Sequence, residues 1–118
     1  MGTLILTSSS KFFMFNDINK FLPKKITDLS ILHITTASND VLDASYIKNH
    51  QKNMSDLNYN FESYDIEGKT SKELKAKVKN FDIIFISGGN NFYLLKIIRE
   101  SGFDTVLKKW LRQKKKSA

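Results

Sequence analysis

The chain has 118 residues, of which 41% are hydrophobic and 26% charged, and its formal net charge is +7. This length gives room for one domain with a buried core, and the composition is that of a folded globular chain rather than a disordered one. The absence of cysteine excludes disulfides, cysteine-based zinc sites and a cysteine nucleophile, and it fits a reducing compartment.

Membrane and nucleic-acid partners are not expected from the charge and hydropathy patterns. No apolar run approaches the ~20 residues that a membrane-spanning helix needs, and no basic segment precedes an apolar core at the N-terminus, as it would in a signal peptide. We therefore expect a cytoplasmic protein. Arg112 and Lys114–Lys116 carry four of the positive charges, and without them the net charge is +3. The excess thus indicates a solvated basic end more than a surface for nucleic acid.

The apolar pattern predicts four short strands that alternate with helices. The expected strands cover residues 3–8, 29–35, 60–66 and 81–87. The expected helices cover residues 12–22, 43–57, 70–80 and 92–101, and a last one begins at 103. Thr70 and Glu73 form a capping-box pattern, Gly102 is a typical helix stop, and 36–40 is predicted to be a polar loop.

This alternation predicts an α/β fold, a three-layer and mostly parallel flavodoxin-like sheet with helices on both faces. We expect residues 1–113 to form a single domain and residues 114–118 a basic tail. Ligands of such sheets bind beyond the carboxyl ends of the strands. The loops expected at that edge are residues 8–10, 36–40 and 87–91.

The segment Ser87–Asn91 (Ser-Gly-Gly-Asn-Asn) is the strongest candidate for a site. A strand that runs through a glycine turn into a helix directs backbone N–H groups toward a ligand. The same glycines also suit a tight strand-to-helix connection without any ligand, and the spacing leaves both interpretations open. The segment is neither a G-x-G-x-x-G fingerprint nor a Walker A motif.

Other chemistry-bearing residues favour structural roles. His33 lies within an apolar strand and is predicted to be a hydrogen-bonded core residue, and His50 is predicted to pack on the apolar face of its helix. Two isolated histidines without cysteine predict no metal site, and we expect no cofactor. Asp40 and Asp43 could face the cleft, although helix N-termini attract acidic residues in any case. A G-x-S-x-G nucleophile elbow is absent.

The fourth strand and its turn resemble the peptidase E family of serine peptidases, the aspartyl dipeptidases. The residues that carry the resemblance are Asp82–Leu95, an apolar strand followed by Gly-Gly-Asn, an aromatic residue and a Leu-Leu pair. Leu4–Ser9 resembles the first strand of that family. Ile34–Ser38 resembles its "I-P-T-A-S" strand, with Thr35 where proline is usual.

The resemblance implies a fold like that of the class I glutamine amidotransferases and hydrolysis of peptides with an N-terminal aspartate. Gly89, with Gly88 beside it, would provide the oxyanion-hole N–H, and Asn90 and Asn91 would bind substrate. Removing one such donor typically costs roughly 3–4 kcal/mol of transition-state stabilisation.

The family's nucleophilic serine lies on the turn after the next strand, within Gly-x-Ser-Ala-Gly, and this sequence contains no such motif. Ser117-Ala118 matches it in letters only. We therefore expect the N-terminal half of such an enzyme, truncated and inactive alone, with an exposed sheet edge that favours a homo-oligomer. The alternatives are a non-catalytic flavodoxin-like binding or interaction module, and a nucleic-acid binder that uses the basic end.

Overall fold

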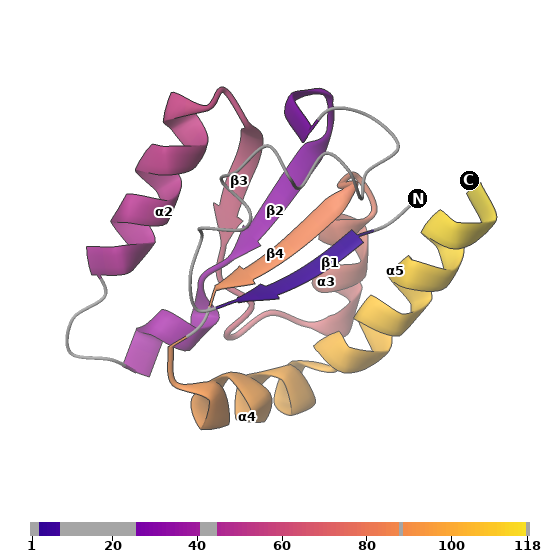
Figure 1. Ribbon diagram of the computed structural model, residues 1–118. Helices are drawn as coiled ribbons and strands as arrows, with labels where there is room; N and C mark the ends of the chain where they lie inside the picture. The colour runs from indigo at the N-terminus through magenta and orange to yellow at the C-terminus, as the bar shows by residue number, and fades with distance from the viewer. Residues whose placement is uncertain (1–2, 8–25, 41–44, 88, 118) are drawn as a thin grey trace.

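The computed structural model of the chain describes residues 3–7, 26–40, 45–87 and 89–117 (Figure 1). Its strands are β1 (Thr3–Thr7), β2 (Ser30–Ile34), β3 (Asn60–Tyr64) and β4 (Ile83–Ser87). Its α-helices are α2 (Ser45–Asp56), α3 (Ser71–Val78), α4 (Asn91–Ser101) and α5 (Phe103–Ser117), and η2 (Ile26–Asp28) and η3 (Thr36–Asp40) are short 3-10 helices. The helix predicted over residues 12–22 lies outside the described residues.

The four strands form one parallel sheet in the order β1-β4-β2-β3. The predicted α/β class with a parallel sheet is confirmed. All five residues of β4 are buried, because this strand lies between two others and is covered on both faces. The strand that leads to the glycine turn is therefore buried along its whole length.

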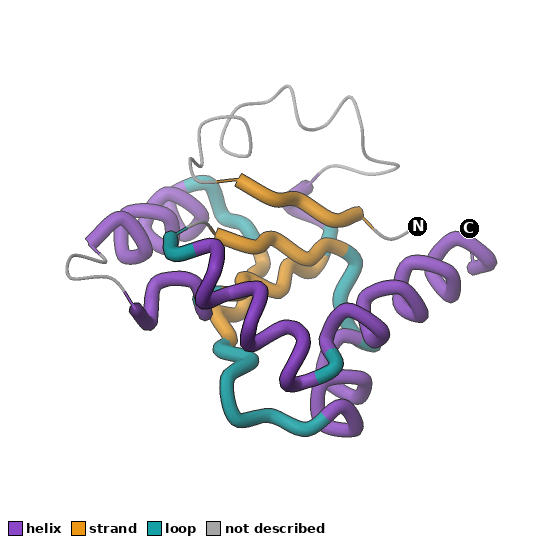
Figure 2. Tube along the Cα trace, turned by 90° about the horizontal axis from the view of Figure 1, so that it is seen from below, coloured by secondary structure: helices purple, strands orange, loops and turns teal. Residues whose placement is uncertain are grey.

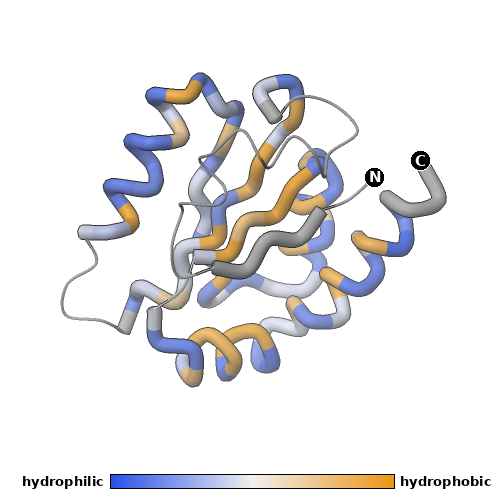
Figure 3. Tube along the Cα trace, in the orientation of Figure 1, coloured by the Kyte–Doolittle hydropathy of each residue, from blue (hydrophilic) through white to orange (hydrophobic). Residues whose placement is uncertain are grey.

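Alternate residues of the central strands pack against different helices, as the pleat of a strand requires. On one face, Leu32 and Ile84 join a core completed by α3, α4 and α5. On the other face, Ile31 and Phe85 pack with Met54 of α2. The sheet is therefore the middle of three layers (Figure 2), and the hydrophobic residues concentrate along β4 and β2 (Figure 3).

Two predicted helix boundaries are confirmed by their capping contacts. Thr70 Oγ1 accepts a hydrogen bond from Glu73 N–H at 3.2 Å and caps α3. Gly102 ends α4 in the left-handed conformation, with φ of 74°, which a residue without a Cβ adopts at little cost.

The strand ends differ from the prediction because side chains intervene. β4 begins at Ile83, since the Asp82 carboxylate accepts hydrogen bonds from Ser30 N–H and Ser30 Oγ, both at 3.1 Å. β3 ends at Tyr64, because the Asp65 carboxylate turns back to accept Glu67 N–H at 3.0 Å. The predicted polar loop at 36–40 is the short helix η3.

The last helix, α5, buries Phe103, Val106 and Trp110, whose spacing of three and four residues places them along one stripe. The Trp110 indole N–H donates to Phe81 O at 3.2 Å and connects α5 to the segment that precedes β4. The backbone of α5 continues to Ser117, so the helix extends into the segment expected to be a tail. No helix in the described part of the chain combines the length and the apolar character needed to cross a bilayer.

Candidate functional site

The glycine turn (Ser87–Asn91) and η3 meet at the carboxyl edge of the sheet. Asn90 N–H donates a hydrogen bond of 3.0 Å to Ala37 O, which joins the turn after β4 to the segment after β2. Two of the three loops predicted at this edge are thus brought together. The third, residues 8–10, and also Gly88 lie outside the described residues.

Gly89 occupies a position with no space for a side chain. A Cβ there would lie 2.5 Å from Ala37 O and 2.6 Å from the Tyr46 hydroxyl oxygen. The residue is nevertheless exposed to solvent on its other side. The close approach of neighbouring groups therefore explains why glycine occupies position 89. The exposed residue remains accessible to a ligand.

The residues after Gly89 begin helix α4. Asn90 is the N-cap, and its Oδ1 accepts a hydrogen bond from Tyr93 N–H at 3.1 Å. Asn91 is the first helical residue and is exposed. The capping contact explains an asparagine at 90 without substrate, so the substrate-binding roles of Asn90 and Asn91 remain predictions.

A buried histidine cluster (His33, His50 and Ser87) holds the other end of the turn. Ser87 Oγ lies 2.6 Å from His33 Nε2 and 3.1 Å from His50 Nδ1. On its far side, His33 Nδ1 lies 3.3 Å from Ser63 Oγ, which also accepts a hydrogen bond from Gln51 Nε2 at 2.8 Å. The His33 ring stacks on Phe85 with centroids 5.0 Å apart.

Burial keeps the ionisable groups of this region neutral. Burial, and secondarily the charge of His50, lower the pKa of His33 from 6.5 to about 4. Burial also lowers the pKa of His50 and raises that of Tyr46. The prediction of a hydrogen-bonded core histidine at 33 is confirmed. His50 is buried as expected, but its bond to Ser87, 37 residues away in sequence, had no signal in the sequence.

A polar network connects η3 to the loop after β3. The Asp65 carboxylate accepts hydrogen bonds from Thr36 Oγ1 at 2.8 Å and from Asn39 Nδ2 at 2.7 Å. Burial would raise the pKa of Asp65, but the hydrogen bonds from Glu67 N–H, Asn39 and Thr36 outweigh it and the pKa is lowered. The carboxylate is therefore charged and occupied in holding the two loops together.

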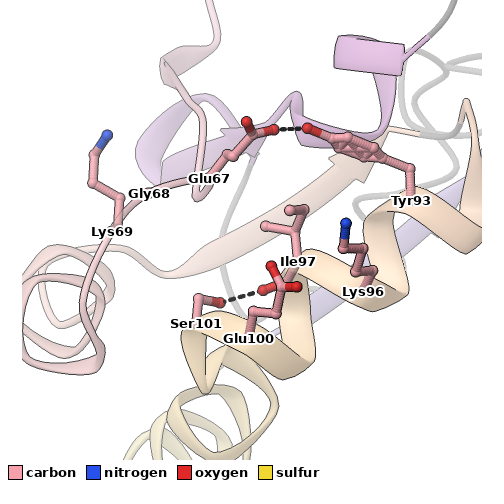
Figure 4. Close-up of a pocket in the computed structure, with 8 residues that line it drawn as sticks. All are labelled: Glu67, Gly68, Lys69, Tyr93, Lys96, Ile97, Glu100 and Ser101. Carbon is pink, nitrogen blue, oxygen red and sulfur yellow. Dashed lines mark hydrogen bonds between the residues drawn. The ribbon is translucent and has the colours of Figure 1, made fainter.

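A cavity of about 430 Å³ lies between this loop and α4 (Figure 4). The Tyr93 hydroxyl donates to the Glu67 carboxylate across one end of it, and Lys96 extends toward it from α4. Its lining combines acids, lysines and hydroxyls: Glu67, Gly68, Lys69, Tyr93, Lys96, Ile97, Glu100 and Ser101. Such a lining suits a small polar molecule that carries charge. Sequence reasoning missed the cavity because its residues come from two segments with no shared pattern.

The described residues contain no group of three or more histidine, aspartate or glutamate side chains that could hold a metal ion. The Asp40 side chain and Asp43 lie outside the described part. The absence of a metal or cofactor remains a prediction.

Residues 4–116 match peptidase family S51, and this match covers nearly the whole chain. A parallel α/β sheet with a glycine turn at its carboxyl edge agrees with that assignment. The chain belongs to peptidase family S51.

Two relatives from Listeria monocytogenes EGD-e extend this result. An uncharacterized peptidase is 29% identical over 109 residues, which are 91% of this chain and 51% of the relative. The crystal structure of a putative peptidase E protein superposes with a TM-score of 0.78 at 26% identity, covering 96% of this chain and 55% of that one. The chain therefore spans about half the length of these relatives, and the resemblance to the peptidase E family is confirmed.

Proposed function

We propose that this chain forms the oxyanion-hole side of a serine-type peptidase that removes aspartate from the N-terminus of peptides, in the cytoplasm. The glycine turn is the observation on which the proposal depends. Gly89 is packed against Ala37 and Tyr46 on one side and is exposed to solvent, and we propose that its backbone N–H is the donor of the site. A donor of this kind stabilises the negative charge that develops on a carbonyl oxygen during acyl transfer.

The nucleophile of the proposed reaction comes from outside these residues. Ser87 is the first residue of the turn, but its hydroxyl is 0% exposed and held by two imidazoles, so it cannot attack a substrate. The sequence contains no Gly-x-Ser-Ala-Gly segment. We propose that the chain alone does not hydrolyse peptides and that a second segment completes the site.

Exposed apolar side chains beside the turn support a second segment. Phe92 is 88% exposed and Leu95 45% exposed, and both lie on α4 within two turns of Gly89. Large apolar side chains grouped at the surface commonly mark a contact with another polypeptide. A segment seated on α4 would cover them and also approach the turn.

Complementation tests this proposal. The purified chain is assayed with Asp-X dipeptides alone and after co-expression with the C-terminal half of the Listeria peptidase E-like protein. We expect turnover only in the combined sample, loss of that turnover with Gly89→Ala, and retention with Gly68→Ala, because a Cβ added at Gly68 would meet no atom within 4 Å. Robust turnover by the chain alone would contradict the proposed division of the site.

The alternative function, a non-catalytic binding module, is favoured by the charged cavity beside α4. A thermal-shift screen with amino acids and dipeptides separates the two functions. Stabilisation that is lost in Lys96→Ala and retained in Gly89→Ala would favour the binding module.

A further inference from the structure

The histidine cluster links the glycine turn to two elements of the fold. His33 comes from β2 and His50 from α2, and both approach the one hydroxyl of Ser87, the residue that begins the turn. All three are buried, at 0%, 5% and 0% exposure. Because the hydroxyl is buried, water does not replace these two contacts. The position of the Ser87 side chain therefore depends on both imidazoles.

Counting hydrogens limits how much charge the cluster can hold. A serine hydroxyl has one hydrogen to donate and lone pairs to accept. With both imidazoles neutral, one nitrogen donates to Ser87 Oγ and the hydroxyl donates to the other, so every group is paired. One added proton is tolerated, since the remaining neutral imidazole still accepts from the hydroxyl. Two added protons make both nitrogens donors and leave the buried hydroxyl hydrogen without an acceptor.

Helix α2 connects this cluster to Gly89. Tyr46 and His50 lie one helical turn apart, with ring centroids separated by 5.8 Å. The Tyr46 hydroxyl lies against Gly89, while His50 holds Ser87. One face of α2 therefore contacts both sides of the glycine turn, and any shift of α2 moves both contacts together.

The surroundings of the cluster offer no compensating negative charge among the described residues. The groups facing it are Phe85 from β4, Ser63 from β3, and Tyr46 and Gln51 from α2. Of these only Tyr46 is titratable, and its pKa is raised by burial. Neither imidazole is hydrogen-bonded to a carboxylate in the described part of the chain, so nothing there stabilises a doubly protonated cluster.

We propose that His33 and His50 are positioning residues that fix the glycine turn through Ser87, and that protonation of both releases it. Acid of about pH 4 and below, where His33 is also protonated, then loosens α2 from the end of β4 while the rest of the sheet stays paired. The proposal rests on the proposed function only for the role of the turn in catalysis. The coupling between the two imidazoles and the turn does not depend on peptide hydrolysis.

Nuclear magnetic resonance of the ¹⁵N-labelled chain tests this coupling without any activity assay. The sequence contains only two histidines, so the imidazole nitrogen signals belong to this cluster alone. In a titration from pH 8 to about pH 3, one unit beyond the pKa of about 4 of His33, we expect both midpoints to lie below the ordinary value of about 6.5. The Gly89 amide is expected to shift with the same midpoints, while the Gly102 amide, bonded to Arg99 O, serves as an internal control and does not follow them.

Two variants separate positioning from general stability. Ser87→Ala removes the shared hydroxyl, and the Gly89 amide should no longer follow the imidazoles; Ser63→Ala removes only the outer contact and should preserve the coupling. If Ser87→Ala does not fold, the wild-type titration still decides. The proposal would be overturned if the imidazoles titrate independently near pH 6.5. It would also be overturned if the chemical shift of the Gly89 amide does not change at their midpoints.

Discussion

Replacing Gly89 by alanine tests most directly how the glycine turn is packed. The added Cβ would lie 2.5 Å from Ala37 O, a backbone atom, and 2.6 Å from the Tyr46 hydroxyl. Ala37 O cannot retreat freely, because it accepts the 3.0 Å hydrogen bond from Asn90 N–H. Overpacking of this kind typically costs about 1–3 kcal/mol, and a weakened hydrogen bond adds about 1 kcal/mol. Taking the middle of these ranges together, we expect the variant to lose about 3 kcal/mol of unfolding free energy through packing alone, in addition to the backbone cost of a side chain at the positive φ of this position.

Urea denaturation followed by Trp110 fluorescence measures this loss by linear extrapolation. Gly68→Ala is the matched control, because Gly68 also has a positive φ, 77°, but an added Cβ there would meet nothing within 4 Å; only the backbone cost of about 1–2 kcal/mol remains. Adding Tyr46→Phe to Gly89→Ala removes one of the two clashes and should restore part of the stability. A Gly89→Ala variant no less stable than Gly68→Ala would refute the packing argument.

The remaining predictions concern pH, capping and assembly. The pKa of His33 is about 4 in the folded chain against 6.5 ordinarily, so the folded state binds fewer protons and the unfolding free energy falls as pH drops from 6.5 to 4, by about 3 kcal/mol. Urea denaturation at pH 7.5 and pH 4 should show this decrease, and His33→Gln should reduce it; equal decreases in both would contradict it. Thr70→Ala removes the cap of α3 and should cost about 1 kcal/mol, seen as a lower melting temperature, whereas Thr105→Ala, at an exposed position, should not. β1 is an edge strand of the sheet formed by the described residues, and pairing of this edge with another chain predicts a dimer or larger assembly in sedimentation; a single sharp monomer boundary would contradict this prediction.

The sequence predicted the class of fold because its signals are local. The buried run of β4, the cap at Thr70 and the stop at Gly102 each depend on neighbouring residues only, and each is confirmed. The strand ends were less accurate, because Asp82 pairs with Ser30, 52 positions away. No local pattern contains that contact.

The site was predicted only in part, for the same reason. The glycine turn was visible as adjacent glycines between a strand and a helix. The histidine cluster was not, because His33 meets Ser87 across 54 positions and His50 across 37. The register of β2 against β4 and the packing of α2 on the sheet bring these residues together. Neither can be predicted from the residues next to them in the sequence.

The strand order also has a consequence for how the chain reaches its fold. β1 pairs with β4 and with no other strand in the described sheet, and Thr3 is matched with Ile83, 80 positions later. β1 is therefore synthesised long before its neighbour β4, whereas β2 and β3 are closer in sequence and can pair early. Because contacts between distant residues slow folding, we expect the insertion of β4 between β1 and β2 to be the late, rate-limiting step. The glycine turn would then be among the last features to form.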